Sequence, residues 1–272
     1  MDIVSYFSDI KIKQTASLAK WVEVLTKKKN FQSVLFNNSY LFIASRDIIL
    51  NSEIFEAKKA YYKASKVSLL GIKLLHNHYP QYKWNEQPPP SLWGTLHWGI
   101  IPLLLADNEE DLYEFATISE LIEGSLESKH YVAMGYALKY LLLGDKAKAK
   151  EKMGDYYSKT DTYGRGLAYV VAGILHSDLA MINEGIEYEI KYFRSMVKNW
   201  EYPMFAFICE PATAWVKLAQ LHGFEPDTSN ELINKELLIK HNNIIFDDII
   251  DIYEALEIEG YKKKTWFKKW LG

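Results

Sequence analysis

Apolar residues recur every three or four positions along most of this chain, and that spacing is the feature that most restricts its fold. From Glu53 to His76, for instance, an apolar stripe with lysines opposite it is formed by Phe55, Tyr62, Val67, Leu70 and Leu74. No stretch alternates apolar and polar residues as a half-buried strand does, and no Asn-Gly or Asp-Gly pair marks a hairpin turn. The sequence therefore predicts an all-α fold.

Within the predicted helices, a leucine-rich end followed by an aspartate occurs three times. These aspartates are Asp107, Asp145 and Asp178, and they are 38 and 33 residues apart, close to the period of tetratricopeptide-type helix–turn–helix repeats. Each is expected to cap the next helix by accepting backbone N–H bonds. A fourth, looser unit runs from Ala214 to Gly223. We predict stacked antiparallel helical hairpins in a degenerate tetratricopeptide-like array.

Pro88, Pro89 and Pro90 interrupt the helical pattern, because a run of prolines cannot continue a helix. They divide the chain into an N-terminal helical hairpin region, 1–87, and a helical-repeat body, 88–260, which we expect to pack together as one unit. The segment 261–272 is a basic aromatic tail with five lysines and no acid. Because the net charge of the whole chain is −3, the part before this tail is acidic.

The composition limits the setting and the partners. The longest apolar run, 98–106, has nine residues, far fewer than the roughly 20 that a membrane-spanning helix needs, and no secretory signal opens the chain. A single cysteine, Cys209, allows neither a disulfide within the chain nor a cysteine zinc site. Arginine, which reads phosphate and guanine, is scarce. We predict a cytoplasmic protein that spans no membrane and binds no nucleic acid.

Two short motifs are candidates for metal chemistry. Asp247, Asp248 and Asp251 match the DDxxD pattern of all-α terpenoid synthases, in which carboxylates hold magnesium and diphosphate. Glu127 and His130 form one E-x-x-H, which is half of a di-iron motif. Neither motif is accompanied by the second motif that such a metal site requires. The aspartates are better explained as a solvated helix start, and the E-x-x-H as surface residues. We predict no metal, no cofactor and no catalytic residue, with a terpenoid-type synthase as the enzyme hypothesis.

The stretch from Asp107 to Glu127 contains eight acids and no lysine or arginine. Carboxylates on one surface add up to a field that attracts a basic partner, and Tyr113 and Phe115 would supply apolar anchors. The alternative is an ordinary solvated helix face. The candidate binding residues are Asp107, Glu109, Glu110, Asp111, Glu114, Glu120 and Glu123.

Several of these patterns together resemble a known family: the helix that begins with Trp93 and Trp98, the turn at Gly144 and Asp145, and the late segments 215–223 and 231–238. From about 91 to 240 the chain is similar to the immunity protein 49 family of bacterial polymorphic-toxin systems. In the last similar element the family usually has a proline where this chain has Asn234. The immunity proteins of PoNe-type DNase toxins, which are also all-helical, have a similar late segment. The residues that carry the resemblance are Trp93, Trp98, 103–107, 136–138, Gly144, Asp145, Asp178, 215–223 and 231–238.

The resemblance implies an immunity protein that neutralises a cognate bacterial toxin by direct, stoichiometric binding and without catalysis. The acidic candidates between Asp107 and Glu123 would then be toxin-binding residues, and the partner would be a basic toxin protein such as a nuclease. The hairpin pattern allows an alternative function. A tetratricopeptide-like scaffold or regulator would bind a peptide or protein partner along its helices.

Overall fold

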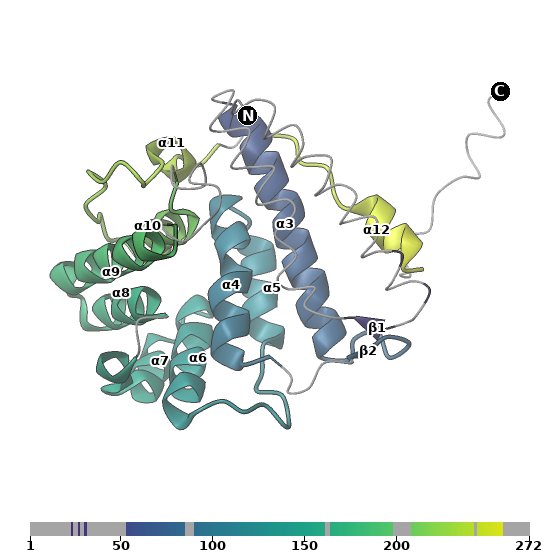
Figure 1. Ribbon diagram of the computed structural model, residues 1–272, viewed down its shortest axis with the longest axis horizontal. Coiled ribbons are helices and arrows are strands. Elements are labelled where there is room, and N and C mark those ends of the chain that lie inside the picture. Colours follow the sequence, from purple (N-terminus) through teal and green to yellow (C-terminus); the bar gives the residue numbers. More distant parts are fainter. Residues whose placement is uncertain are drawn as a thin grey trace.

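The computed structural model describes residues 23, 27, 30–31, 53–84, 90–160, 164–197, 208–241 and 244–257, and most of them are helical (Figure 1). Among these residues, the β-structure consists of two strands of two residues each, β1 and β2, which pair in parallel. The predicted all-α fold is confirmed. The elements are β1 (Asn30–Phe31), α3 (Ile54–Leu75), β2 (Lys83–Trp84), α4 (Leu92–Leu105), α5 (Glu109–Ile118), α6 (Lys129–Leu142), α7 (Lys146–Met153), the 3₁₀ helix η2 (Tyr156–Lys159), α8 (Arg165–His176), α9 (Leu179–Val197), α10 (Glu210–Leu221), α11 (Lys235–Leu238) and α12 (Ile250–Ala255).

Helices that follow one another in the sequence pack as pairs. The closest pairs are α8 with α9, α6 with α7, and α3 with α4, and α5 also packs against α4. Figure 1 shows α8 and α9 on one side of the molecule and α3 and α12 on the other, with α4 between them. None of the described helices is long and apolar enough to cross a membrane. Most of the first 52 residues of the predicted hairpin region 1–87, and the whole of the predicted tail 261–272, lie outside the described residues.

One turn geometry ends α4, α6 and α8. One of the first two residues after each helix is left-handed, with φ of 57° at Asp107, 81° at Gly144 and 57° at Ser177. The next backbone N–H then reaches back to a carbonyl in the last turn, as Asp145 N does to Tyr140 O at 2.9 Å. This is the Schellman arrangement, which satisfies carbonyls that a helix end would leave unpaired. The chain therefore turns sharply enough to place the next helix against the previous one.

The capping prediction is confirmed for two of the three aspartates. Asp145 accepts from Lys148 N at 3.0 Å, and Asp178 accepts from Met181 N at 3.0 Å. For Asp107 the prediction is wrong, because this residue occupies the left-handed position of its turn. Asn108 caps α5 instead, through its side-chain oxygen and Asp111 N. The Asp107 carboxylate is thereby free to face the interior.

The buried face of α3 differs from the predicted stripe at one position. Ile54, Ala57 and Tyr61 are buried, whereas the Phe55 side chain is 46% exposed. The reason is geometric: successive helix positions are about 100° apart, so Phe55 lies beside the buried face. Its ring packs near that of His241, with 5.0 Å between the centroids.

The core is centred on α10. Every residue from Ala212 to Ala219 is buried, and a helix that is buried on all sides lies inside a fold rather than on it. This helix packs against α4, α8 and α9. The same hydrophobic core also includes side chains of α3 and α12, such as Tyr61 and Ile252.

Candidate functional site

The acidic stretch that the sequence singles out forms the α4–α5 turn, α5 and the connection to α6. Although no lysine lies within it, lysines from distant elements approach five of its seven candidate residues. These lysines come from α3, α6, α10 and the segment after α11. The ion pairs are Asp107 with Lys58 and Lys217, Glu109 with Lys240, Asp111 with Lys66, Glu114 with Lys73, and Glu120 with Lys139.

The most buried of these groups is a cluster of Lys58, Asp107 and Lys217. Their side chains are 1%, 13% and 7% exposed. Lys217 Nζ also donates to Leu237 O at 3.0 Å, and Lys58 Nζ donates to Ile239 O at 2.5 Å. Burial lowers the pKa of Lys217 to about 8, although Asp107 opposes that effect. The cluster joins α3, the α4–α5 turn, α10 and the end of α11.

A lysine in an otherwise apolar helical run, Lys217, is a signal of this cluster that the sequence-based prediction missed. Lys217 lies between Val216 and Leu218 in the buried part of α10, and Lys58 follows the fully buried Ala57. A lysine is almost never fully buried unless it is paired. Such a position in a predicted core helix therefore indicates a buried carboxylate partner elsewhere in the chain.

Two further acids hold helix ends. Glu127 accepts from Leu92 N at 2.8 Å and Trp93 N at 2.9 Å, which satisfies two N–H groups at the start of α4. Burial raises the pKa of Glu127. Glu120 accepts from Tyr136 Oη at 2.9 Å and pairs with Lys139. Burial alone would raise the pKa of Glu120, but the contacts with Lys139 and Tyr136 outweigh burial, and the pKa is lowered.

A second group of residues in the stretch faces solvent. Tyr113 is 59% exposed, Leu121 41% and Leu126 85%, and Glu110 and Glu123 are exposed and form no ion pair with the described residues. These five residues are called the α5 surface below. The prediction that Phe115 is a surface anchor is wrong. Its side chain is fully buried, because Leu112, Phe115 and Ala116 share the inner face of α5.

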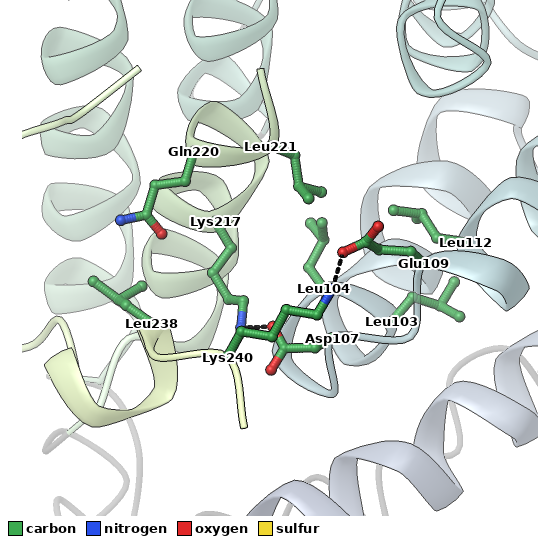
Figure 2. Close-up of a pocket in the computed structure, with 10 residues that line it drawn as sticks. All are labelled: Leu103, Leu104, Asp107, Glu109, Leu112, Lys217, Gln220, Leu221, Leu238 and Lys240. Atoms are coloured by element: carbon green, nitrogen blue, oxygen red, sulfur yellow. Dashed lines mark hydrogen bonds and ion pairs between the residues drawn. The ribbon is translucent and has the colours of Figure 1, made fainter. Parts of the chain in front are cut away.

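A pocket of about 170 Å³ lies beside the buried cluster (Figure 2). Five leucines from α4, α5, α10 and α11 line it. The Lys240 side chain extends across Asp107 and Lys217 toward Glu109, whose Oε1 is 2.7 Å from Lys240 Nζ. The polar lining consists of Asp107, Glu109, Lys217, Gln220 and Lys240.

The DDxxD motif does not lie on one helix face in this structure. Asp247 and Asp248 precede α12, which begins at Ile250. Asp248 accepts from Ile249 N at 2.7 Å. Among the described residues no group of three or more histidine, cysteine, aspartate or glutamate side chains is placed to hold a metal ion.

The acidic stretch thus has two parts with different chemistry. The paired acids connect elements that are distant in the sequence, and for their carboxylates to pair with a partner instead, existing ion pairs would have to break. The α5 surface presents apolar and acidic side chains that a partner can contact directly. Compared with protein-family models, curated proteins and solved structures, the chain matches none of them.

Proposed function

We propose that this chain is an immunity protein that neutralises a cognate toxin by direct, stoichiometric binding, and that the toxin docks on the α5 surface. In this proposal the helix pairs form a stacked, degenerate tetratricopeptide-like array that holds α5 in place. The observation that carries the proposal is the α5 surface itself. It combines exposed apolar side chains with two carboxylates that form no ion pair with described residues, all on one segment of the chain.

The composition of the α5 surface suits protein binding. Tyrosine is enriched at the centres of interfaces, where a few buried anchors supply most of the binding energy. Tyr113 is such an anchor at the middle of α5, and Leu126 is 85% exposed. Large apolar side chains exposed to this degree lose unfavourable contact with water when a partner covers them.

The helix α5, which carries Glu110 and Tyr113 of this surface, is also fixed from behind. Lys73 pairs with Glu114 at 2.7 Å, and Lys66 pairs with Asp111 at 2.7 Å, so both ion pairs fix α5 to α3. Lys139 donates to Ser119 O at 2.7 Å and fixes the end of α5 to α6. A preformed surface loses less conformational freedom on binding, which favours a tight stoichiometric complex.

The charges of the α5 surface favour a basic partner. Glu110 and Glu123 form no ion pair with described residues, so they are available to a lysine or arginine of the toxin. Exposed charges at the rim of an interface act mainly on the association rate. We therefore expect these two carboxylates to steer the encounter, while Tyr113 and the leucines set the lifetime of the complex.

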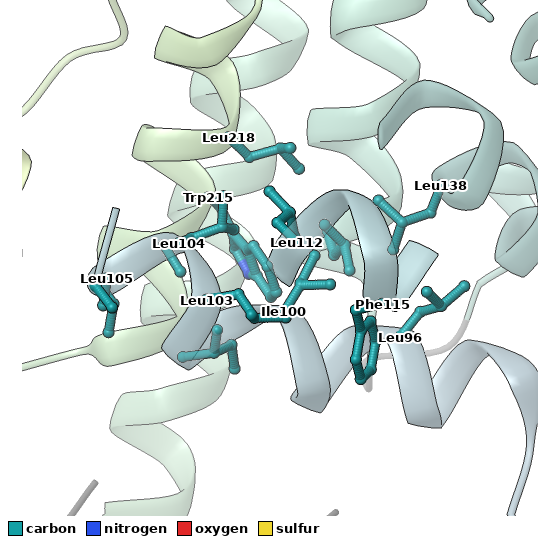
Figure 3. Close-up of a cluster of buried hydrophobic side chains, with 14 of the residues drawn as sticks. Leu96, Ile100, Leu103, Leu104, Leu105, Leu112, Phe115, Leu138, Trp215 and Leu218 are labelled. Carbon is teal, nitrogen blue, oxygen red and sulfur yellow. The ribbon is translucent and has the colours of Figure 1, made fainter. Parts of the chain in front are cut away.

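The alternative, a scaffold or regulator that binds a peptide or protein partner along its helices, is less well supported by the packing. In this chain α10 packs against α4, α8 and α9, so the faces of these helices that meet α10 are already covered. Trp215 and Leu218 of α10 lie among the leucines of α4 (Figure 3). A peptide groove on that side would require α10 to leave the core.

The double substitution Glu110→Lys and Glu123→Lys tests the docking site. Association with the purified toxin, which we take to be the product of the adjacent gene, should be at least several times slower and less sensitive to salt. The matched control reverses Glu187 and Glu225, two exposed acids outside α5. Surface-based kinetics at two salt concentrations measures both variants. Equal association rates for the test and control variants would exclude this docking site.

A further inference from the structure

The pocket beside the buried cluster has an unequal charge balance. Two ammonium groups, Lys58 and Lys217, share the single carboxylate of Asp107. The second cation of the pocket, Lys240, is already paired with Glu109. A buried site with excess positive charge is costly unless an anion or further dipoles offset it. Here the carbonyls of Leu237 and Ile239 offset part of the charge.

Lys217 retains one N–H bond that has no acceptor among the described residues. An ammonium group has three N–H bonds, and among the described residues Lys217 Nζ donates to two acceptors, Asp107 Oδ1 and Leu237 O. Because Lys217 lines the pocket while Lys58 does not, the third bond of Lys217 is available to a ligand. The Gln220 side-chain amide, also in the lining, supplies a second donor, and this one is neutral.

The rest of the lining defines the ligand. Five leucines make most of the walls apolar, and the carboxylates of Asp107 and Glu109 border the pocket, so a dianion such as phosphate would be repelled about twice as strongly as a monoanion. The volume of about 170 Å³ equals that of roughly six water molecules, well below the roughly 300 Å³ or more of a drug-sized site. A small ligand with a single negative charge and a branched apolar tail suits the apolar walls, the bordering carboxylates and the volume of this pocket.

We propose that this pocket binds a small branched aliphatic monocarboxylate, with its carboxylate on Lys217 and Gln220 and its tail among the leucines. The same chemistry occurs in a free acid and at the C-terminus of a peptide that ends in leucine. The site goes beyond the proposed toxin binding and does not depend on it.

One exposed ion pair borders this pocket. Lys240 and Glu109 are 56% and 55% exposed, and an exposed pair of this kind contributes little to stability. Lys240 follows α11 and reaches across to the start of α5 (Figure 2). When that pair separates, Lys240 adds a second cation near the carboxylate of the ligand.

The test is a titration with sodium 4-methylpentanoate, followed by NMR of methyl-labelled leucines in the full chain. We expect saturable shifts of the Leu104, Leu221 and Leu238 methyl groups at millimolar acid. The neutral amide of the same acid should bind about tenfold or more weakly, since it loses a charge-assisted hydrogen bond. Inorganic phosphate should produce no saturable shift at these leucines. A short peptide ending in leucine, with and without C-terminal amidation, distinguishes the two ligand sources.

Two variants locate the site. Leu238→Trp fills the pocket from its apolar side and should abolish the shifts, whereas Leu179→Trp, at an exposed leucine of α9, should leave them unchanged. Lys217→Met should weaken binding of the acid to the level of the amide. Thermal unfolding confirms that each variant folds. The proposal is overturned if the acid gives no saturable shifts, if the amide binds equally well, or if Leu238→Trp binds like the native chain.

Discussion

At the residue scale, buried charged groups distinguish this chain from an ordinary helical bundle. Glu189 is 5% exposed, and its carboxylate accepts from Trp215 Nε1 at 3.0 Å. Burial raises the pKa of Glu189 to about 7, so the group binds its proton more tightly in the folded chain than in the unfolded one. Groups of this kind make stability depend on pH.

Glu189→Gln should remove one pH dependence of stability. The native pKa is raised from 4.5 to about 7, so the protonated carboxyl stabilises the fold below pH 4.5, and this contribution is lost as pH rises through 7. At about 1.4 kcal/mol per pH unit, the loss amounts to about 3 kcal/mol. The glutamine amide still accepts from Trp215.

The variant should therefore match the native chain near pH 4 and exceed its unfolding temperature at pH 8. Glu187→Gln, at an exposed position of the same helix, is the control. Thermal unfolding across this pH range measures all three chains. If Glu189→Gln lowers the unfolding temperature at pH 8, the assignment of a buried, proton-binding carboxyl is incorrect.

Asp107→Asn should be among the most destabilising polar substitutions. It leaves Lys58 and Lys217 as buried ammonium groups without their carboxylate, and breaking a buried pair in this way costs about 3–5 kcal/mol. Glu110→Gln, at an exposed neighbour, should change stability by less than about 0.5 kcal/mol. Denaturant unfolding measures both. Similar stabilities of the two variants would mean that Asp107 is solvated rather than buried.

At the element scale, the recurring turn allows helices to pack as pairs. Its left-handed residue is Gly144 after α6 but Ser177 after α8, and a residue with a Cβ atom is strained in that conformation. A Cβ atom added at Gly144 would have nothing within 4 Å. Substitutions at this position therefore report on backbone conformation alone.

Gly144→Ala should destabilise the chain by about 1–2 kcal/mol, because alanine is strained in the left-handed conformation and glycine is not. Ser177→Gly should have the opposite sign or no effect, since it relieves the same strain while making the unfolded chain more flexible. Thermal unfolding of both variants provides the comparison. Equal signs for the two substitutions would show that the two turns are not equivalent.

The features that the sequence predicts correctly are local ones. The helices and the caps at Asp145 and Asp178 depend on residues within a few positions of each other. The cap predicted at Asp107 is wrong by one residue, because Asn108 is an equally good capping residue. The choice between the two depends on their tertiary partners. Those partners, Lys58 and Lys217, are 49 and 110 residues away in the chain. No spacing rule connects such positions, and the acidic stretch could not be recognised as largely neutralised.

At the scale of the whole molecule, the chain is organised around α10. Its apolar residues fill the core between α4, α8 and α9, and Lys217 on the same helix joins the charged cluster. The elements that hold the fold together are therefore inside it. The α5 surface remains at the outside, supported from behind by α3 and α6 through ion pairs.

The measurement that tests the proposed function most directly combines this chain with the purified product of the adjacent gene. Cells expressing that product alone should lose viability, and co-expression of this chain should restore it. Light scattering after size-exclusion chromatography should give the mass of a stoichiometric complex. The variant Glu110→Lys with Glu123→Lys should protect less well than the Glu187→Lys, Glu225→Lys control. A toxic partner that neither binds this chain nor loses its toxicity in its presence would contradict the immunity function.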